Sequence, residues 1–182
     1  MMGWEVRSRT KLLDCSPWLR VYVDEVLLED KKTLIPDFNV IEAAPFAIIF
    51  PVLADGRIAL IRHYRHAVGK IVYDLPGGDL EEDEAPLACA QRELLEETGL
   101  QAPDWRHLGT FRMSGVRGIT DAHCYMAAGA VRVAEPNPGD LQSVSVHPSS
   151  PQELLRMWSS DEWAVLDTAA VVGLGLGHLG LV

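Results

Sequence analysis

The segment from Gly77 to Leu100, GGDLEEDEAPLACAQRELLEETGL, constrains the fold more than any other part of this chain. Its second half consists of strong helix formers without an internal glycine. Pro86 suits the first turn of a helix, and Gly99 suits the left-handed position just after the last turn. The segment therefore predicts a helix over residues 85–98. The apolar residues that recur at helical spacing, and so predict its buried face, are Leu87, Ala90, Leu94 and Leu95.

The same segment carries a high density of negative charge. Glu93 and Glu97 are four residues apart and lie one above the other on a helix, and Glu96 joins them three residues after Glu93. Like charges at this spacing destabilise a helix by about 0.2–0.5 kcal/mol per pair. One interpretation is a solvated acidic helix. The other is a site of hard oxygen ligands, because three clustered carboxylates suit Mg²⁺ or Mn²⁺.

Two further features of the segment favour the metal site. Gly77 and Gly78 allow a tight loop whose backbone approaches the predicted helix closely, so that a carbonyl there can complete a metal shell. Arg92 follows Glu84 by eight residues, about two helical turns, and its guanidinium can reach back to hold the loop. On this interpretation the carboxylates hold metal ions, and the metal ions hold a phosphate.

Composition limits the class of protein. The chain has 182 residues, of which 48% are apolar and 23% charged, which suits one globular domain with a core. Its net charge of −10 makes nucleic acid an unexpected partner, although bridging metals allow an acidic enzyme to bind anionic substrates. Three widely spaced cysteines predict free thiols in a reducing compartment.

The two ends of the chain predict no membrane segment. The amino terminus lacks an apolar signal core. The carboxy-terminal run TAAVVGLGLGHLGLV has fifteen residues, fewer than the roughly 20 that a membrane-spanning helix needs. We expect this run to be a buried terminal helix or a subunit contact, and we expect the protein to be cytoplasmic.

Hydrophobic patterning predicts the other elements. Strands are expected at 19–28, 38–43, 46–53 and 58–64, with a hairpin at Asp55-Gly56, and shorter strands at 107–111, 123–131 and 143–148. Helices are expected at 149–160, with Ser150 as N-cap and Pro151 at the first position, and from Asp167 onward. This order predicts an α/β (α+β) protein with a mixed sheet. Residues 1–42 are expected to form an amino-terminal β lobe, and residues 43–182 the main domain.

The spacing across the acidic segment matches the Nudix box at every specified position. Gly78 is followed after five residues by Glu84, and after seven more by Arg92-Glu93-Leu94, then Glu96-Glu97 and Gly99-Leu100. The chain therefore resembles the Nudix hydrolases. The stretches LIRHYRH and DLPGG and the amino-terminal strands resemble, more loosely, the branch that hydrolyses ADP-ribose and nucleoside-diphosphate sugars.

This resemblance implies a fold and an activity. The fold would be the Nudix fold, a mixed sheet sandwiched between helices (α/β/α). The activity would be Mg²⁺-dependent hydrolysis of the diphosphate bond of ADP-ribose or a related nucleotide sugar, giving a nucleoside monophosphate and a sugar phosphate. The metals would neutralise phosphate oxygens and activate a water. Members of this branch dimerise through the amino-terminal lobe, so a homodimer is expected.

The resemblance also assigns roles to residues. Glu84 and Arg92 would orient the loop and the helix. Arg65 would contact the substrate diphosphate, unless it is a surface arginine near a strand end. Trp18 and Tyr22 would stack on the nucleotide base, unless they pack in a core or dimer contact. The implied metal ligands are Glu93, Glu96, Glu97 and the carbonyl of Gly77. His63 and His66 are interpreted as exposed loop histidines.

The general base is not evident from the sequence. Relatives often place a glutamate in a loop before a late strand, but Gln142 and Ser143 stand where an acidic pair is expected. The alternatives are Glu96, Asp121, Glu135 and Asp140, or hydroxide generated by the metals alone. Other functions stay open as well. One alternative is a Nudix hydrolase of nucleoside triphosphates, dinucleoside polyphosphates or NADH. Another is a non-catalytic ADP-ribose-binding module, which the intact box disfavours.

Overall fold

The computed structural model describes residues 3–137, 139, 144–160 and 163–182. The chain divides into two compact units. Unit 1 comprises Met1–Pro45 and Arg112–Asp121, and unit 2 comprises Phe46–Phe111 and Ala122–Val182.

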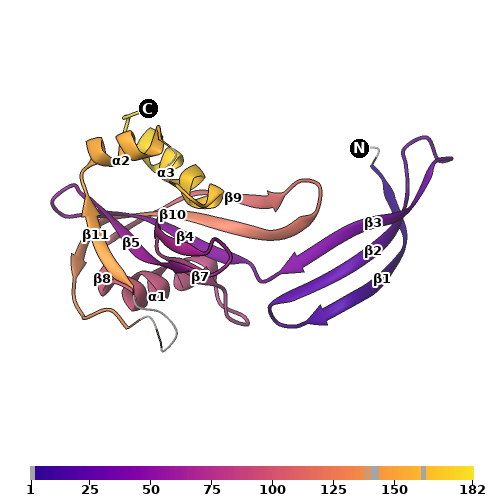
Figure 1. Cartoon of the computed structure of the whole chain (residues 1–182), viewed down its shortest axis with the longest axis horizontal. Helices are drawn as coiled ribbons and strands as arrows, with labels where there is room; N and C mark the ends of the chain where they lie inside the picture. Colours follow the sequence, from indigo (N-terminus) through magenta and orange to yellow (C-terminus); the bar gives the residue numbers. More distant parts are fainter. Residues whose placement is uncertain (1–2, 138, 140–143, 161–162) are drawn as a thin grey trace. The chain divides into compact units, whose positions relative to one another are not determined.

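Unit 1 is built on an antiparallel sheet of β1 (Glu5–Cys15), β2 (Leu19–Leu27) and β3 (Leu34–Ala43) (Figure 1). The hydrophobic pattern predicted β2 and part of β3 but not β1. Every residue of β1 is exposed, so this strand lacks the alternation that marks a half-buried strand. Asp24 is only 2% exposed, and Arg9 holds it with two hydrogen bonds of 2.7 and 2.8 Å.

Unit 2 contains a mixed sheet, as predicted. Its central strand β4 (Phe46–Leu53) pairs in parallel with β10 (Gly118–Arg132) and antiparallel with β5 (Ile58–Arg65). Asp55-Gly56 forms the turn between β4 and β5, and Gly56 takes the positive φ of 83° that favours glycine. The remaining strands are β6 (Lys70–Asp74), β7 (Gly77–Asp79), β8 (Leu100–Gln101), β9 (Asp104–Ser114) and β11 (Ser145–Ser149).

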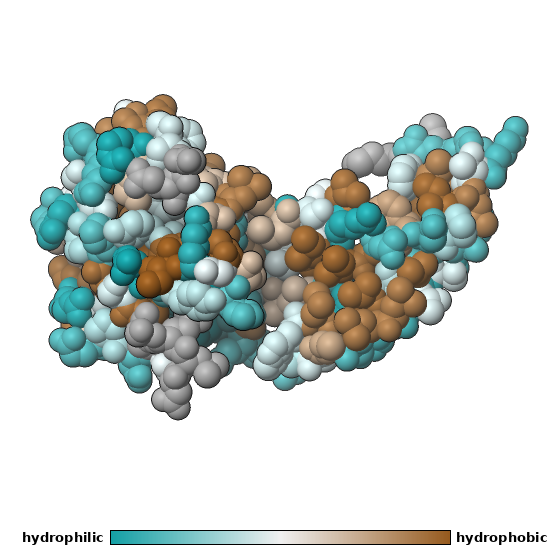
Figure 2. Space-filling model, in the orientation of Figure 1, coloured by the Kyte–Doolittle hydropathy of each residue, from teal (hydrophilic) through white to brown (hydrophobic). Residues whose placement is uncertain are grey.

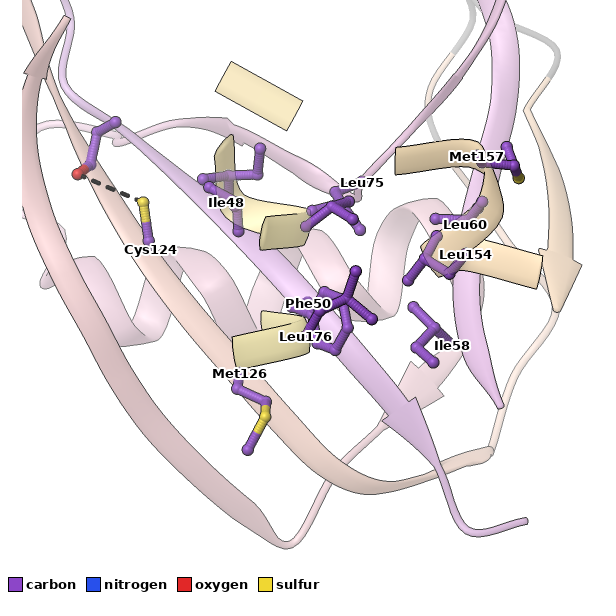
Figure 3. Close-up of a cluster of buried hydrophobic side chains, with 13 residues drawn as sticks. Ile48, Phe50, Ile58, Leu60, Leu75, Cys124, Met126, Leu154, Met157 and Leu176 are labelled. Atoms are coloured by element: carbon purple, nitrogen blue, oxygen red, sulfur yellow. Dashed lines mark hydrogen bonds between the residues drawn. The ribbon is translucent and has the colours of Figure 1, made fainter. Parts of the chain in front are cut away.

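Alternating side chains of β4 separate two cores, one on each face of the sheet. Ile48 and Phe50 pack with α2 (Pro151–Trp158) and α3 (Leu166–His178) in the cluster drawn in Figure 3. Ala47 and Ile49 pack on the other face against α1 (Pro86–Thr98). Because strand residues point alternately to opposite faces, one continuous apolar run serves both cores. The predicted α/β/α sandwich is therefore confirmed (Figure 1).

Helix α1 begins and ends where its capping residues predict. Pro86 is its first residue, and Gly99 follows it with a left-handed φ of 69° while its N–H donates to the Leu95 carbonyl. The predicted buried face is only partly right, since Leu87 is 39% exposed. A helical side chain leans toward the amino terminus, so a first-turn residue such as Leu87 points past the start of the helix. The residues that α1 buries are Cys89, Ala90, Leu94 and Thr98.

The last two helices also follow the predicted boundaries closely. Ser150 caps α2 by accepting a hydrogen bond from the Glu153 N–H at 3.1 Å. The apolar terminal run forms α3, and a Cβ on Gly175 would meet the Phe50 ring at 2.5 Å. Glycine thus lets this helix approach the sheet closely. Within the described residues, no helix is long and apolar enough to cross a membrane.

Candidate active site

The predicted glycine loop at Gly77 and Gly78 belongs to the short strand β7, which pairs with β4, and it meets helix α1 at two carboxylates. The Gly77 N–H donates to Glu97 Oε2 at 2.9 Å. A Cβ on Gly78 would lie 2.3 Å from Glu93 Oε1, and a Cβ on Gly77 would lie 2.3 Å from the Ala47 carbonyl oxygen on β4. A side chain at Gly77 would collide with the β4 backbone, and one at Gly78 would displace the Glu93 carboxylate, so the predicted close contact between the loop backbone and the acidic helix is present.

Arg92 fastens the loop to the helix. Its Nε and Nη2 donate to the two carboxylate oxygens of Glu84, each at 2.9 Å, which is the contact predicted from their spacing. Its Nη2 also donates to the Asp79 carbonyl at 3.2 Å. The hydrogen bonds from Arg92 lower the pKa of Glu84 to about 2. Glu84 therefore stays charged and the loop stays pinned over a wide pH range.

The two inner carboxylates are poorly compensated. Burial, together with the nearby charge of Glu93, raises the pKa of Glu97 to about 7, and the hydrogen bond from the Gly77 N–H only partly offsets these effects. Burial likewise raises the pKa of Glu93, although Arg92 Nη1 donates to Glu93 Oε1 at 2.6 Å. A positive charge placed beside both groups would lower both pKa values.

These groups fit a divalent cation in part. Glu93 and Glu97 are half-buried oxygen donors beside a glycine backbone, which is the chemistry that hard cations prefer. Glu96 instead pairs with Arg92 Nη1 at 3.2 Å, and 47% of its side chain is exposed. Among the described residues, no three acidic, histidine or cysteine side chains are gathered as a metal site. The metal roles of Glu93, Glu96, Glu97 and the Gly77 carbonyl therefore stay predictions.

A cavity of about 340 Å³ adjoins the glycine loop. Gly77, Gly78 and Asp79 form part of its wall, together with apolar side chains of β4. Arg65 on β5 and Asp167 on α3 supply opposite charges to the same wall. Burial raises the pKa of Asp167. The cavity thus combines apolar surface with a few charged groups, as small-molecule sites commonly do.

Arg65 belongs to a buried hydrogen-bond network centred on Asp74. Arg65 donates to Asp74 Oδ2 from Nε at 2.9 Å and from Nη2 at 2.6 Å. His63 Nε2 lies 3.2 Å from the same oxygen, and the Thr168 hydroxyl donates to Asp74 Oδ1. The interpretation of His63 as an exposed loop residue is wrong, since it is 2% exposed. Strand β5 runs on to Arg65, and alternation turns His63 inward.

Sequence reasoning missed Asp74, Asp167 and Thr168. Asp74 carried a signal, because it interrupts the apolar run IVYDLP just before the two glycines. A charged residue inside a buried strand is rare unless it is paired. Its partner Thr168 is 94 residues away, and no local pattern connects the two.

The predicted base-stacking residues lie in unit 1. Trp18 is 67% exposed, and the Arg9 guanidinium lies 5.0 Å from the centre of the Tyr22 ring. Their proposed contact with a nucleotide base stays a prediction.

The candidate general bases are not gathered at the cavity by any described contact. Glu135 is exposed and lies 3.6 Å from Arg132. Asp121 belongs to unit 1, where it pairs with Arg112 at 3.0 Å. The described residues do not include Asp140, Gln142 and Ser143.

Comparison with known proteins places the chain in a family. Residues 44–167 match the model of the NUDIX domain. A CMP-5'-(N-acetyl-N-hydroxy-3-aminopropyl)phosphonate hydrolase of Streptomyces rubellomurinus is 32% identical over 181 residues, covering 96% of this chain and 84% of that protein. An ADP-ribose pyrophosphatase of Mycobacterium tuberculosis is 36% identical over 85 residues, covering 45% of this chain and 40% of that protein.

A solved structure shares the whole fold. The crystal structure of an ADP compounds hydrolase matches with a TM-score of 0.80, covering 99% of this chain and 97% of that one at 15% identity. At that identity the match shows the fold alone. The family-model match spans most of the chain, and it contains the glycine loop, the acidic helix and every residue of the cavity wall except Thr168. The chain therefore belongs to the Nudix family and is a Nudix pyrophosphohydrolase.

Proposed function

We propose that this protein hydrolyses the diphosphate bond of ADP-ribose or a related nucleoside-diphosphate sugar, with Mg²⁺ or Mn²⁺ as cofactor. The products would be a nucleoside monophosphate and a sugar phosphate. The observation that carries the proposal is the pair of poorly compensated carboxylates, Glu93 and Glu97, beside a loop that also walls a cavity containing Arg65. The similarity to ADP-ribose pyrophosphatases of Mycobacterium tuberculosis and Bacillus subtilis supports this substrate class.

In this proposal each group has a separate task. Glu93 and Glu97, joined by Glu96 and the Gly77 carbonyl, would hold the cation, which supplies positive charge to the phosphate oxygens and lowers the pKa of an attacking water. Arg65 would donate to the substrate diphosphate from the cavity wall. Arg92, bound to Glu84, would keep the glycine loop and the acidic helix in register.

A second substrate class has its own support. The relative from Streptomyces rubellomurinus that matches 96% of this chain is a CMP-linked phosphonate hydrolase. Its substrate, like ADP-ribose, carries a nucleotide joined to a second group. A CMP-linked substrate is therefore the alternative to an ADP-linked or other nucleotide sugar.

A substrate panel tests these proposals. Purified protein with Mg²⁺ is given ADP-ribose, ADP-glucose, GDP-mannose, a CMP-phosphonate, NADH, diadenosine polyphosphate and nucleoside triphosphates, and release of monophosphate or pyrophosphate is followed. We expect a nucleoside monophosphate from a nucleotide sugar, and no product with EDTA. Fastest hydrolysis of the CMP compound would support the second class. Turnover of triphosphates alone would exclude both.

We also propose that the amino-terminal lobe predicted at residues 1–42 mediates a homodimer and contributes Trp18 and Tyr22 to base binding. Strand β1 stands at the end of the strand order, and apolar surface gathers over unit 1 (Figure 2). Exposed apolar side chains of this unit include Trp4, Val6, Leu12, Leu13, Trp18 and Leu34. Light scattering of the wild type and of Leu12→Glu tests this proposal. A monomeric wild type would contradict it.

A further inference from the structure

Asp74 is the most heavily hydrogen-bonded carboxylate beside the cavity. Its Oδ2 accepts two hydrogen bonds from Arg65 and lies 3.2 Å from His63 Nε2. Its Oδ1 accepts from the Leu75 N–H at 2.9 Å and from the Thr168 hydroxyl. A carboxylate offers about four lone-pair positions, so these partners use its full accepting capacity. The carboxylate therefore cannot turn without breaking several bonds at once.

Arg65 connects this buried network with the cavity. Asp74 is 2% exposed, whereas 42% of the Arg65 side chain is exposed and the residue lines the cavity. Its two bonds to Asp74 use Nε and Nη2. A guanidinium has five N–H donors in a rigid plane, so three donors remain for another partner. Fixing one edge of the plane also fixes the direction of the other.

The network reaches a separate element of the fold through Thr168. This residue lies in the first turn of α3 and is 1% exposed. Its hydroxyl bonds Asp74 on β6, and Asp74 in turn bonds Arg65 on β5. A hydroxyl buried only to stabilise the core needs no connection to an exposed cation. Here one continuous chain of hydrogen bonds runs from helix α3 to a guanidinium in the cavity wall.

We propose that Asp74 and Thr168 are positioning residues for Arg65, so that helix α3 fixes the direction in which the Arg65 guanidinium meets the anionic diphosphate of the substrate. This proposal rests on the proposed function, because it assigns Arg65 to the substrate. Thr168 also lines the cavity, but it is only 1% exposed and its hydroxyl is engaged by Asp74. It acts through Asp74, and its effect on substrate binding requires Arg65.

A double-mutant cycle tests this dependence. KM and kcat are measured for Thr168→Val, Arg65→Ala and the double variant, with the best substrate of the panel. We expect Thr168→Val alone to raise KM by about 3- to 10-fold, in the range of network mutations, with kcat nearly unchanged. In the Arg65→Ala background the same change should leave KM unaltered, because two residues acting in one chain are not additive. Thr168→Ser retains the hydroxyl and should restore the wild-type KM.

Matched measurements separate positioning from simple stabilisation. Thr120→Val removes another buried threonine hydroxyl, which bonds the Ala44 carbonyl in unit 1, and should lower the melting temperature without changing KM. Equal KM changes from Thr168→Val with and without Arg65 would overturn the proposal, and so would an unchanged KM. If Thr168→Val does not fold, Thr168→Ala takes its place in the cycle.

The failure of this proposal is distinguishable from failure of the proposed function. If the wild type hydrolyses no member of the panel, the proposed function fails, and the dissociation constant of ADP replaces KM as a probe of diphosphate binding. Weaker ADP binding by Thr168→Val, only when Arg65 is present, would still support positioning. Unchanged ADP binding would overturn it.

Discussion

Asp74 and Glu97, two carboxylates of unit 2, have pKa values shifted in opposite directions. Burial alone raises the pKa of both groups. At Asp74, hydrogen bonds from His63, Thr168 and Arg65 together with the Arg65 charge outweigh burial, and the pKa is lowered. At Glu97, the Gly77 N–H does not outweigh burial and the neighbouring Glu93, and the pKa is raised to about 7.

The difference separates a carboxylate that stabilises the fold from one that costs stability. A buried charge with satisfied partners joins β5, β6 and α3 into one structure. A buried charge without sufficient partners destabilises the folded chain unless a cation is bound. Strongly raised pKa values beside a cavity are typical of functional sites. This contrast supports the proposed binding role of Glu97 and the proposed positioning role of Asp74.

The largest expected effect comes from Glu97→Gln. Removing the charge should lower hydrolysis by about 100-fold or more. Mutating a residue that only hydrogen-bonds a metal ligand already lowers activity by up to about 100-fold, and Glu97 is a proposed ligand. Hydrolysis of the best panel substrate with saturating Mg²⁺ measures the change. Glu82→Gln is the matched control, because Glu82 is an exposed residue of the same acidic segment. Equal activity in the two variants would remove Glu97 from the mechanism.

Asp74→Asn should lower stability as well as raise KM through Arg65. The amide keeps the shape of the carboxylate, but its NH₂ group is a donor and would face the N–H and O–H donors that now bond Asp74. The change also leaves the Arg65 charge unpaired. Breaking a buried ion pair costs roughly 3–5 kcal/mol, and we expect about 2–3 kcal/mol because Arg65 is partly exposed to water. Urea unfolding measures this free energy. A stability equal to the wild type would mean that the network does not hold the sheet and α3 together.

The sequence predicted the acidic side of this comparison much better than the Asp74 side. Helix α1, its end at Gly99 and the Arg92–Glu84 contact all depend on residues within a few turns of each other. Local spacing carries that information. The bond between Thr168 and Asp74 joins residues 94 positions apart, so only the packed sheet and helix reveal it.

Two other features escaped prediction for related physical reasons. Strand β1 is exposed along its whole length, so burial imposes no alternating pattern on its sequence. The segment Arg112–Asp121 joins the amino-terminal strands in unit 1 although about 70 residues separate them, with Gly118 opposite Ile41. Such strand pairing depends on topology, and local propensity does not specify it.

The two carboxylates should also give opposite pH dependences of stability in metal-free protein. The folded pKa of Glu97 is raised to about 7 from its usual 4.5. Its contribution to the stability of the folded chain is therefore complete below pH 4.5 and is lost as the pH rises through 7. The folded pKa of Asp74 lies below its usual 3.8. Its contribution to the stability of the folded chain is therefore present above pH 3.8 and is lost as the pH falls through the folded pKa.

This pH difference is measurable by urea unfolding in EDTA. At pH 8 we expect Glu97→Gln to be more stable than the wild type by at least about 1 kcal/mol, and the difference should vanish near pH 4.5. Saturating Mg²⁺ should stabilise the wild type more than the variant. A wild type that is more stable than Glu97→Gln at pH 8 without metal would contradict the inference that Glu97 is poorly compensated.

The smallest expected effect comes from Asp55→Asn, which separates burial from ion pairing. Asp55 also pairs with an arginine, Arg57, at 2.7 Å, but 52% and 50% of the two side chains are exposed. The hydrogen bond from Arg57 lowers the pKa of Asp55, yet water competes for both groups and such pairs contribute little. The asparagine can still accept from the Arg57 N–H in the turn. We therefore expect unchanged hydrolysis and an unchanged melting temperature. A loss as large as that of Asp74→Asn would show that the arginine contact alone, without burial, accounts for the stability assigned to Asp74.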